Sequence, residues 1–136
     1  MKGYLLVRAG GKAYGLPVGR VLEVSDVTEV LAVPRSLPSV RGLTPVRGRL
    51  MPLIHLGAFL TGQTAPASTS QVQTVVVVEL GGRQVAFEVD DADAVVREPA
   101  LPVPRGQTLP WAAGVAEQPG GLVPILDLDA LGERLG

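Results

Sequence analysis

Few side chains in this sequence could support catalysis or hold a metal. The chain has no cysteine and a single histidine, His55, so neither a Cys/His zinc site nor a Cys/His nucleophile pair can be built. His55 lies in an alternating apolar stretch, where a solvent-facing or hydrogen-bonded strand residue is the simplest interpretation. The sequence therefore indicates no enzyme, no cofactor and no metal centre.

Two further patterns could suggest ligand binding. Residues 88–93 contain four carboxylates, the ligand type that calcium prefers, but their spacing is not that of an EF-hand loop, so we favour a solvated turn. Gly10-Gly11 and Gly81-Gly82 lack the strand-to-helix setting of a phosphate loop. Both pairs instead predict tight type I′ hairpin turns.

The composition predicts a compact protein with little net charge. Of the 136 residues, 46% are hydrophobic and 18% are charged, which is enough to bury a core. The formal net charge of −1 gives no basic surface for nucleic acid. No signal peptide is evident, and no apolar run reaches the roughly 20 residues that span a bilayer. We expect a cytoplasmic protein without direct membrane insertion.

The chain repeats itself. Residues 4–18 resemble residues 75–89 at an offset of about 71, and residues 48–56 resemble residues 120–128 at an offset of about 72. Such a repeat is too long for a solenoid unit and indicates a duplicated β module. We expect one domain over 1–136, with a first repeat at about 3–60, a polar linker at about 61–73 and a second repeat at about 74–132.

Each repeat reads as the same series of short β elements. The predicted hairpins are followed by third strands at Val21 to Val24 and Ala94 to Val96, then by proline-rich connectors at 34–38 and 99–110. A strand with an internal proline comes next, and Pro52 and Pro124 predict an edge or a bulge there.

A short helical turn closes each repeat, at 57–60 and 129–135, and Asp127 or Asp129 could cap the second one. Many short strands with Gly and Pro between them predict two similar small barrels that share one core. Whether each barrel is contiguous in sequence, or strands cross between the repeats, stays open.

The differences between the repeats point to a candidate site. Glu23 is replaced by Ala94 in the second repeat, and Arg47 has no charged counterpart there. A charge that the barrel itself required should occur in both copies. The two residues either form an exposed ion pair worth about 0 to 1 kcal/mol, or a recognition site in which Glu23 holds the planar fork of Arg47 for a partner.

Together, several motifs resemble the CheW family, the coupling adaptors of bacterial chemotaxis arrays. In the first repeat the motifs lie at 14–18, 21–24, 40–42, 46–48 and 50–54; in the second they lie at 85–90, 114–115 and 122–129. The resemblance covers about residues 3–132.

This resemblance implies an all-β fold of two five-stranded SH3-like barrel subdomains around a shared hydrophobic core, without catalysis. It implies two protein partners: the regulatory domain of the histidine kinase CheA and the cytoplasmic tip of chemoreceptors in membrane-bound arrays. Arg47 would contact the receptor with support from Glu23, and the apolar Val24 and Val46 beside them would face the receptor groove.

The chain also departs from the family pattern. Pro45-Val46 replaces the usual Asn-Leu before Arg47, and His55 replaces the usual Asp. A pilus-motility or other chemosensory pathway therefore fits as well as a flagellar one. A different class, a small ligand-binding regulatory barrel, would be indicated by an apolar pocket between the halves.

Overall fold

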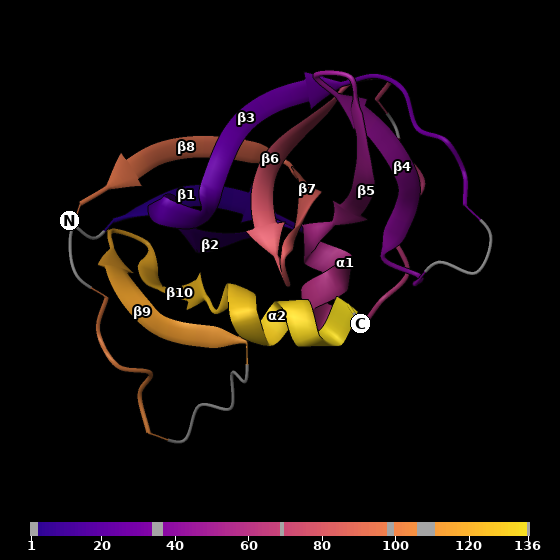
Figure 1. The fold of residues 1–136 in the computed structure, drawn as a ribbon. Coiled ribbons are helices and arrows are strands. Elements are labelled where there is room, and N and C mark those ends of the chain that lie inside the picture. The colour runs from indigo at the N-terminus through magenta and orange to yellow at the C-terminus, as the bar shows by residue number, and fades with distance from the viewer. Residues whose placement is uncertain (1–2, 34–36, 69, 98–99, 106–110, 136) are drawn as a thin grey trace.

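The computed structural model describes residues 3–33, 37–68, 70–97, 100–105 and 111–135, which form an almost entirely β structure with two short α-helices (Figure 1). The proline-rich connectors predicted at 34–38 and 99–110 lie partly outside these residues. The strands are β1 Tyr4–Ala9, β2 Lys12–Pro17, β3 Val21–Val27, β4 Val40–Val46, β5 Arg49–His55, β6 Gln73–Leu80, β7 Arg83–Val89, β8 Asp91–Val96, β9 Ala112–Gln118 and β10 Gly121–Leu126. The helices are the 3-10 turn η1 Val18–Arg20, α1 Leu56–Thr61 and α2 Leu128–Leu135.

The two sheets exchange strands between the repeats. One sheet has the order β8-β1-β2-β10-β9 and is called barrel A here; the other has the order β3-β6-β7-β5-β4 and is called barrel B. Each barrel takes the hairpin of one repeat and the last three strands of the other (Figure 1). The predicted pair of similar five-stranded units is confirmed, and the open question of contiguity is answered by a crossing of strands.

The glycine turns close the two hairpins, and the turn at Gly10 also contacts an element that follows the other barrel. Gly10 and Gly11 have φ of 61° and 79°, and Gly81 has φ of 60°, as type I′ turns require. A Cβ on Gly57 of α1 would lie 3.2 Å from the backbone nitrogen of Gly10. Glycine at both positions therefore lets α1, which follows barrel B, rest on a turn of barrel A.

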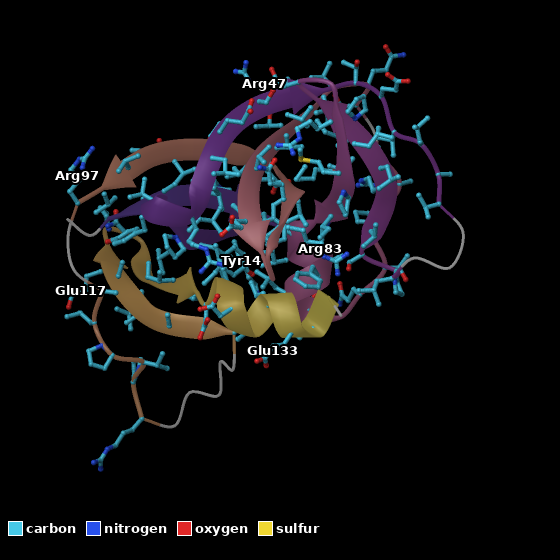
Figure 2. The ribbon with its side chains drawn as sticks, viewed as in Figure 1. Tyr14, Arg47, Arg83, Arg97, Glu117 and Glu133 are labelled. Atoms are coloured by element: carbon cyan, nitrogen blue, oxygen red, sulfur yellow. The ribbon has the colours of Figure 1, made fainter. Side chains whose placement is uncertain are left out.

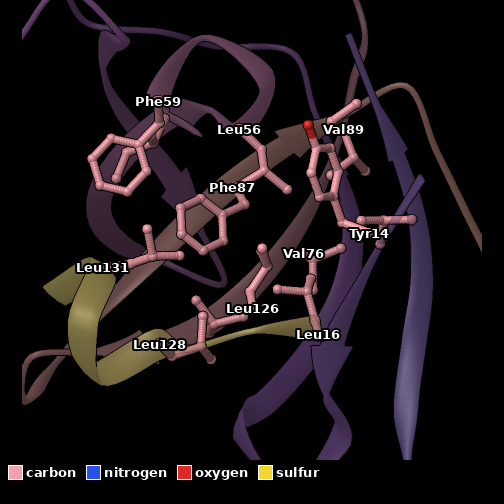
Figure 3. Close-up of a cluster of buried hydrophobic side chains, with 14 of the residues drawn as sticks. Tyr14, Leu16, Leu56, Phe59, Val76, Phe87, Val89, Leu126, Leu128 and Leu131 are labelled. Carbon is pink, nitrogen blue, oxygen red and sulfur yellow. The ribbon is translucent and has the colours of Figure 1, made fainter. Parts of the chain in front are cut away.

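Buried side chains form one large shared core and a smaller core inside each barrel. The shared core lies between the barrels and under both helices, as Figure 3 shows for Phe87 and its neighbours. The interior of barrel B is filled by Val27, Val46, Met51, Leu53, Val75, Val77 and Ala86. The cluster inside barrel A is smaller among the described residues: Tyr4, Ala116 and Ile125 are buried, with Leu6 and Val96 partly buried against them.

The expectation that Pro52 and Pro124 mark an edge is wrong, but the alternative of a bulge is close to what is observed: a register shift lies opposite Leu53 and Ile54 and another lies at Ile125 and Leu126. β5 and β10 are interior strands of their sheets. The pairing of β5 with β7 begins only at Leu53, and that of β10 with β2 is confined to Ile125. Neither proline therefore removes a ladder hydrogen bond on that side, so an interior strand tolerates the missing N–H.

His55 and its counterpart Asp127 both cap helices. The Nδ1 atom of His55 accepts a hydrogen bond from the backbone N–H of Ala58 at 3.0 Å, and an Asp127 carboxylate oxygen accepts one from that of Ala130 at 3.1 Å. Each satisfies an amide of the first helical turn that has no partner within the helix. His55 is therefore a hydrogen-bonded strand-end residue, and Asp127 is the cap of the second helix.

The acidic run at 88–93 is divided between different contacts. Glu88 pairs with Arg41, while Asp90 accepts a hydrogen bond from the backbone of Gly11 at 3.3 Å. No group of three or more His, Cys, Asp or Glu residues that could hold a metal ion occurs in the described part of the chain. Within the same residues, none of the helices is long and apolar enough to cross a membrane.

Candidate interaction site

Arg47 is the first residue of a tight turn that joins β4 to β5. The turn is closed by the pair Val46 and Arg49, and Arg47 and Gly48 have φ of 51° and 78°. Arg47 is the one non-glycine residue with positive φ in the described ranges. A left-handed conformation costs a side-chain-bearing residue about 1–2 kcal/mol. The turn thus holds an arginine at a position where glycine or asparagine would be more stable.

The guanidinium of Arg47 is anchored on one side and open on the other. Its Nε lies 2.9 Å from a carboxylate oxygen of Glu23, and the two side chains are 79% and 24% exposed. No other hydrogen bond of the Arg47 side chain occurs within the described residues, so its two terminal nitrogens face solvent at the edge of the molecule (Figure 2). The arrangement presents a planar, oriented pair of donors to a partner.

The same ion pair joins the two edges of barrel B. Glu23 lies in β3 and Arg47 follows β4, the two outer strands in that sheet order. Thr44 adds a second link because its hydroxyl donates to the carbonyl of Glu29 at 2.7 Å. The exposed ion pair contributes about 0 to 1 kcal/mol to stability. Both interpretations of the pair, as a clasp and as a recognition site, are therefore compatible with its geometry.

Val24 and Val46 occupy different environments. Val24 is 48% exposed and lies opposite Val76, a residue of the shared core, so it extends that core to the surface. Val46 is only 5% exposed and points into barrel B. The structure therefore brings Glu23 and Arg47 into contact, places Val24 on the other face of the same strand, and places Val46 beneath the turn as a support.

Several exposed apolar residues were not selected from the sequence, among them Leu22 and Leu50 on strands of barrel B and Val95 on β8 of barrel A. Val95 of β8 lies opposite Leu5 of the shared core, as Val24 lies opposite Val76. The signal that could have found it is the repeat itself, because Val24 and Val95 are counterparts at an offset of about 71.

Arg41 shows what a structural arginine looks like in this protein. Its guanidinium contacts both carboxylate oxygens of Glu88, at 2.5 and 3.1 Å, and donates to the carbonyl of Pro66 at 2.6 Å. The side chains of Arg41 and Glu88 are only 14% and 13% exposed. Each of the three Arg41 guanidinium nitrogens donates a hydrogen bond that ties β4 to β7 or to the linker, whereas only the Nε of Arg47 does so.

Comparison with known proteins decides the family. The CheW-like domain family matches residues 3–135, almost the whole chain. The chain belongs to the CheW-like domain family. The resemblance of the motifs is thereby confirmed, and with it the fold of two SH3-like subdomains; CheW-like proteins are scaffold and adaptor proteins of chemotaxis.

One relative by sequence and one solved structure support this assignment. A chemotaxis protein CheW from Klebsiella aerogenes is 26% identical over 135 residues, covering 97% of this chain and 74% of the relative. The crystal structure of the scaffolding protein TtCheW from Thermoanaerobacter tengcongensis superposes with a TM-score of 0.80 at 21% identity, covering 96% of this chain and 91% of that one. The second likeness shows that the crossed strands belong to a known fold.

Proposed function

We propose that this CheW-like chain is a non-catalytic adaptor that couples chemoreceptors to the histidine kinase CheA. Family membership supports the adaptor class, and the Glu23–Arg47 site supports the receptor contact. The observation that carries the proposal is an exposed arginine kept in a strained turn and oriented by a carboxylate, in only one of two otherwise similar barrels. Backbone strain of this kind concentrates at functional positions.

The proposed receptor-binding surface consists of Arg47, Glu23 and Val24, with Val46 supporting the turn from below. A receptor tip built from helices offers carboxylates and helix-end carbonyls, which suit the paired donors of a guanidinium. The half-exposed Val24 adds apolar area on the same edge strand, on the face opposite to that of Glu23. An interface of this kind combines an apolar contact with an arginine anchor, the residue type enriched at binding hot spots.

The second proposed partner is the regulatory domain of CheA, bound at surfaces away from the Glu23–Arg47 pair, at the barrel ends. Each contact is proposed to be transient and to bury about 1,200 Å² or less. A micromolar contact corresponds to roughly −8 kcal/mol. Tethering within an array of membrane-bound receptors raises the effective concentration and makes such contacts firm. We assign the chain a cytoplasmic location beside these arrays, with no nucleic-acid partner and no membrane insertion of its own.

The test measures the two partners separately. The purified chain is titrated by calorimetry against the CheA regulatory domain and against a receptor-tip fragment from its own organism. We expect saturable micromolar binding to the kinase domain for both the wild type and Arg47→Ala. Receptor binding should fall about tenfold in Arg47→Ala, as loss of one charged hydrogen-bonding partner predicts.

Arg49→Ala is the matched control, because Arg49 is also exposed and lies two residues further along the same hairpin. It should bind both partners as the wild type does. Absence of kinase binding at tens of micromolar would contradict the adaptor role. A large fall in melting temperature for Arg47→Ala would instead favour the purely structural interpretation of the ion pair. Which motility output the pathway controls, flagellar or pilus-driven, would follow from the receptor that binds.

A further inference from the structure

A cleft of about 600 Å³ opens in barrel A between β2 and β10. The two strands are parallel and pair only through Gly15 and Ile125, so their earlier residues diverge and leave a wedge. Lys12 and Tyr14 lie on one side of the wedge, and Leu122 and Pro124 lie on the other. A cleft of this volume falls within the range of small-molecule sites.

The cleft exists because barrel A carries smaller side chains than barrel B at matching positions. Val123 stands where barrel B has Met51, and Gly121 stands where it has Arg49. Met51 is 4% exposed within the filled interior of barrel B, whereas barrel A buries only a small cluster around Tyr4. The backbone is the same in both barrels and does not by itself create the cleft. The smaller side chains of the second repeat leave the space in barrel A.

One wall of the cleft is aromatic. Tyr14 and Trp111 meet edge to face with their ring centroids 5.8 Å apart, and both line the cleft. Burial raises the pKa of the Tyr14 phenol above its ordinary value of 10.0. Aromatic walls with a few polar groups are typical of sites for small organic ligands.

The charged lining is mainly positive. Arg8 and Lys12 line the cleft along with a single carboxylate, Asp93. Lys12 takes part in no ion pair among the described residues, and the Arg8 guanidinium donates only to the Gly11 carbonyl, at 3.4 Å. Two cations against one anion, all on an apolar wedge, are complementary to a ligand with an apolar body and a negative end.

We propose that this cleft binds a small amphipathic carboxylate, whose hydrocarbon or aromatic body enters the wedge beside Trp111 and whose anionic group meets Lys12 and Arg8. This site is separate from the Glu23–Arg47 surface and gives the adaptor a small-molecule input. It does not rest on the coupling role, since its test needs neither the kinase nor a receptor.

The test uses Trp111 as a reporter, because it is the sole tryptophan of the chain. Its fluorescence is titrated with phenylpropionate, with the neutral phenylpropanol and with the cationic phenylpropylamine, three ligands that share one apolar body. We expect saturable binding in the order carboxylate, alcohol, amine. Binding of the amine as tight as that of the carboxylate, or no saturation by any ligand up to millimolar concentration, would overturn the proposal.

Two variants locate the binding site. Lys12→Gln should weaken phenylpropionate about three- to tenfold and leave phenylpropanol unchanged. Arg83→Gln is the matched control, because Arg83 is the counterpart of Lys12 in barrel B and lies outside the cleft. Equal effects of Lys12→Gln and Arg83→Gln would overturn the assignment of the anionic end.

Val123→Met should close the wedge, as Met51 does in barrel B, and abolish binding of all three ligands. A melting curve shows whether this variant is folded. If it is not, the comparison of Lys12→Gln with Arg83→Gln decides whether the ligand binds in the cleft. A result in which Val123→Met weakens binding of the CheA regulatory domain, while no small ligand binds the wild type, would assign the cleft to a protein partner and overturn the proposal.

Discussion

Barrel A and barrel B arrange equivalent strands in the same order, but they differ in how side chains fill the interior and in whether an ion pair joins the outer strands. In barrel B the interior is filled by Met51 and its neighbours, and the Glu23–Arg47 pair joins the outer strands. In barrel A the positions equivalent to Met51, Glu23 and Arg47 carry Val123, Ala94 and Pro119, and a cleft remains. A duplicated module has thus kept its backbone and changed what it offers to other molecules.

The positions that stayed alike are those that solve backbone problems common to both barrels. Gly10 and Gly81 permit the hairpin turns, and His55 and Asp127 cap the helices with different chemistry at the same place. Each of these requirements follows from the geometry of the chain rather than from a partner. Divergence at Glu23 and Arg47 has no such backbone cause, which is why it points to function.

The largest expected loss of stability follows from substituting Gly42 or Gly114. At each of these glycines a connecting segment, containing Leu31 or Leu101, packs against the strand. A Cβ on Gly42 would lie 2.2 Å from the carbonyl oxygen of Leu31, and Gly42 has φ of 149°. Its counterpart Gly114 would meet the carbonyl oxygen of Leu101 at 2.6 Å without a positive φ. Gly42→Ala should therefore lower the free energy of unfolding by about 3 kcal/mol or more, and Gly114→Ala by about 1–3 kcal/mol.

Urea denaturation measures both variants. Gly120→Ala serves as the control, because a Cβ there would meet nothing within 4 Å, and it should stay within about 0.5 kcal/mol of the wild type. Equal losses at Gly42 and Gly114 would show that the steric clash alone decides the cost.

The next largest expected loss in the free energy of unfolding comes from truncating a side chain in the interior of barrel B rather than at the matching position of barrel A. Met51→Ala should cost about 2–4 kcal/mol, because it leaves a cavity in a closely packed core. Val123→Ala should cost about 1–2 kcal/mol, because its surroundings already open into the cleft. Chemical denaturation of the two variants gives the difference. A larger loss at Val123 would contradict the view that barrel A is the less filled barrel.

Arg47→Gly separates recognition from stability in barrel B. Glycine relieves the left-handed strain, worth about 1 kcal/mol, and loses an exposed ion pair worth about 0 to 1 kcal/mol. The melting temperature should therefore stay the same or rise slightly, while receptor binding falls as in Arg47→Ala. If Arg47→Gly melts well below the wild type, the ion pair is chiefly a clasp between β3 and β4.

The smallest effect tests the two helix caps. His55→Ala and Asp127→Ala should each cost about 1 kcal/mol, because each leaves an amide of a first helical turn without its partner. His55→Asp should stay within about 0.5 kcal/mol of the wild type, since the second repeat shows that a carboxylate serves at this position. Thermal unfolding at neutral pH resolves the three variants. A loss in His55→Asp as large as in His55→Ala would mean that the ring contributes by packing.

Much of the candidate site could be predicted from the sequence, and the misses have separate causes. Comparison of the repeats was enough to select Glu23 and Arg47, which the structure places 2.9 Å apart. Val46 was expected to face a receptor groove because it is the apolar neighbour of Arg47 in the sequence. The structure buries it instead, because its face of β4 points into barrel B. Pro52 was expected at an edge because proline lacks an N–H, but the pairing of β5 with β7 begins only after it.

Features that act over a few residues or through repetition can be read from the sequence: the hairpin turns at glycine pairs, a cap at Asp127 or Asp129, the duplication and the motifs of the CheW-like family. The folded structure was needed to show that Asp127 is the cap, which hairpin joins which barrel, which face of β4 is buried, and where the cleft opens. Local rules depend on backbone geometry that neighbouring residues carry with them. Strand exchange and unfilled space depend on contacts between residues far apart in the sequence, such as Val24 with Val76 and Gly15 with Ile125, and no short pattern reports on them.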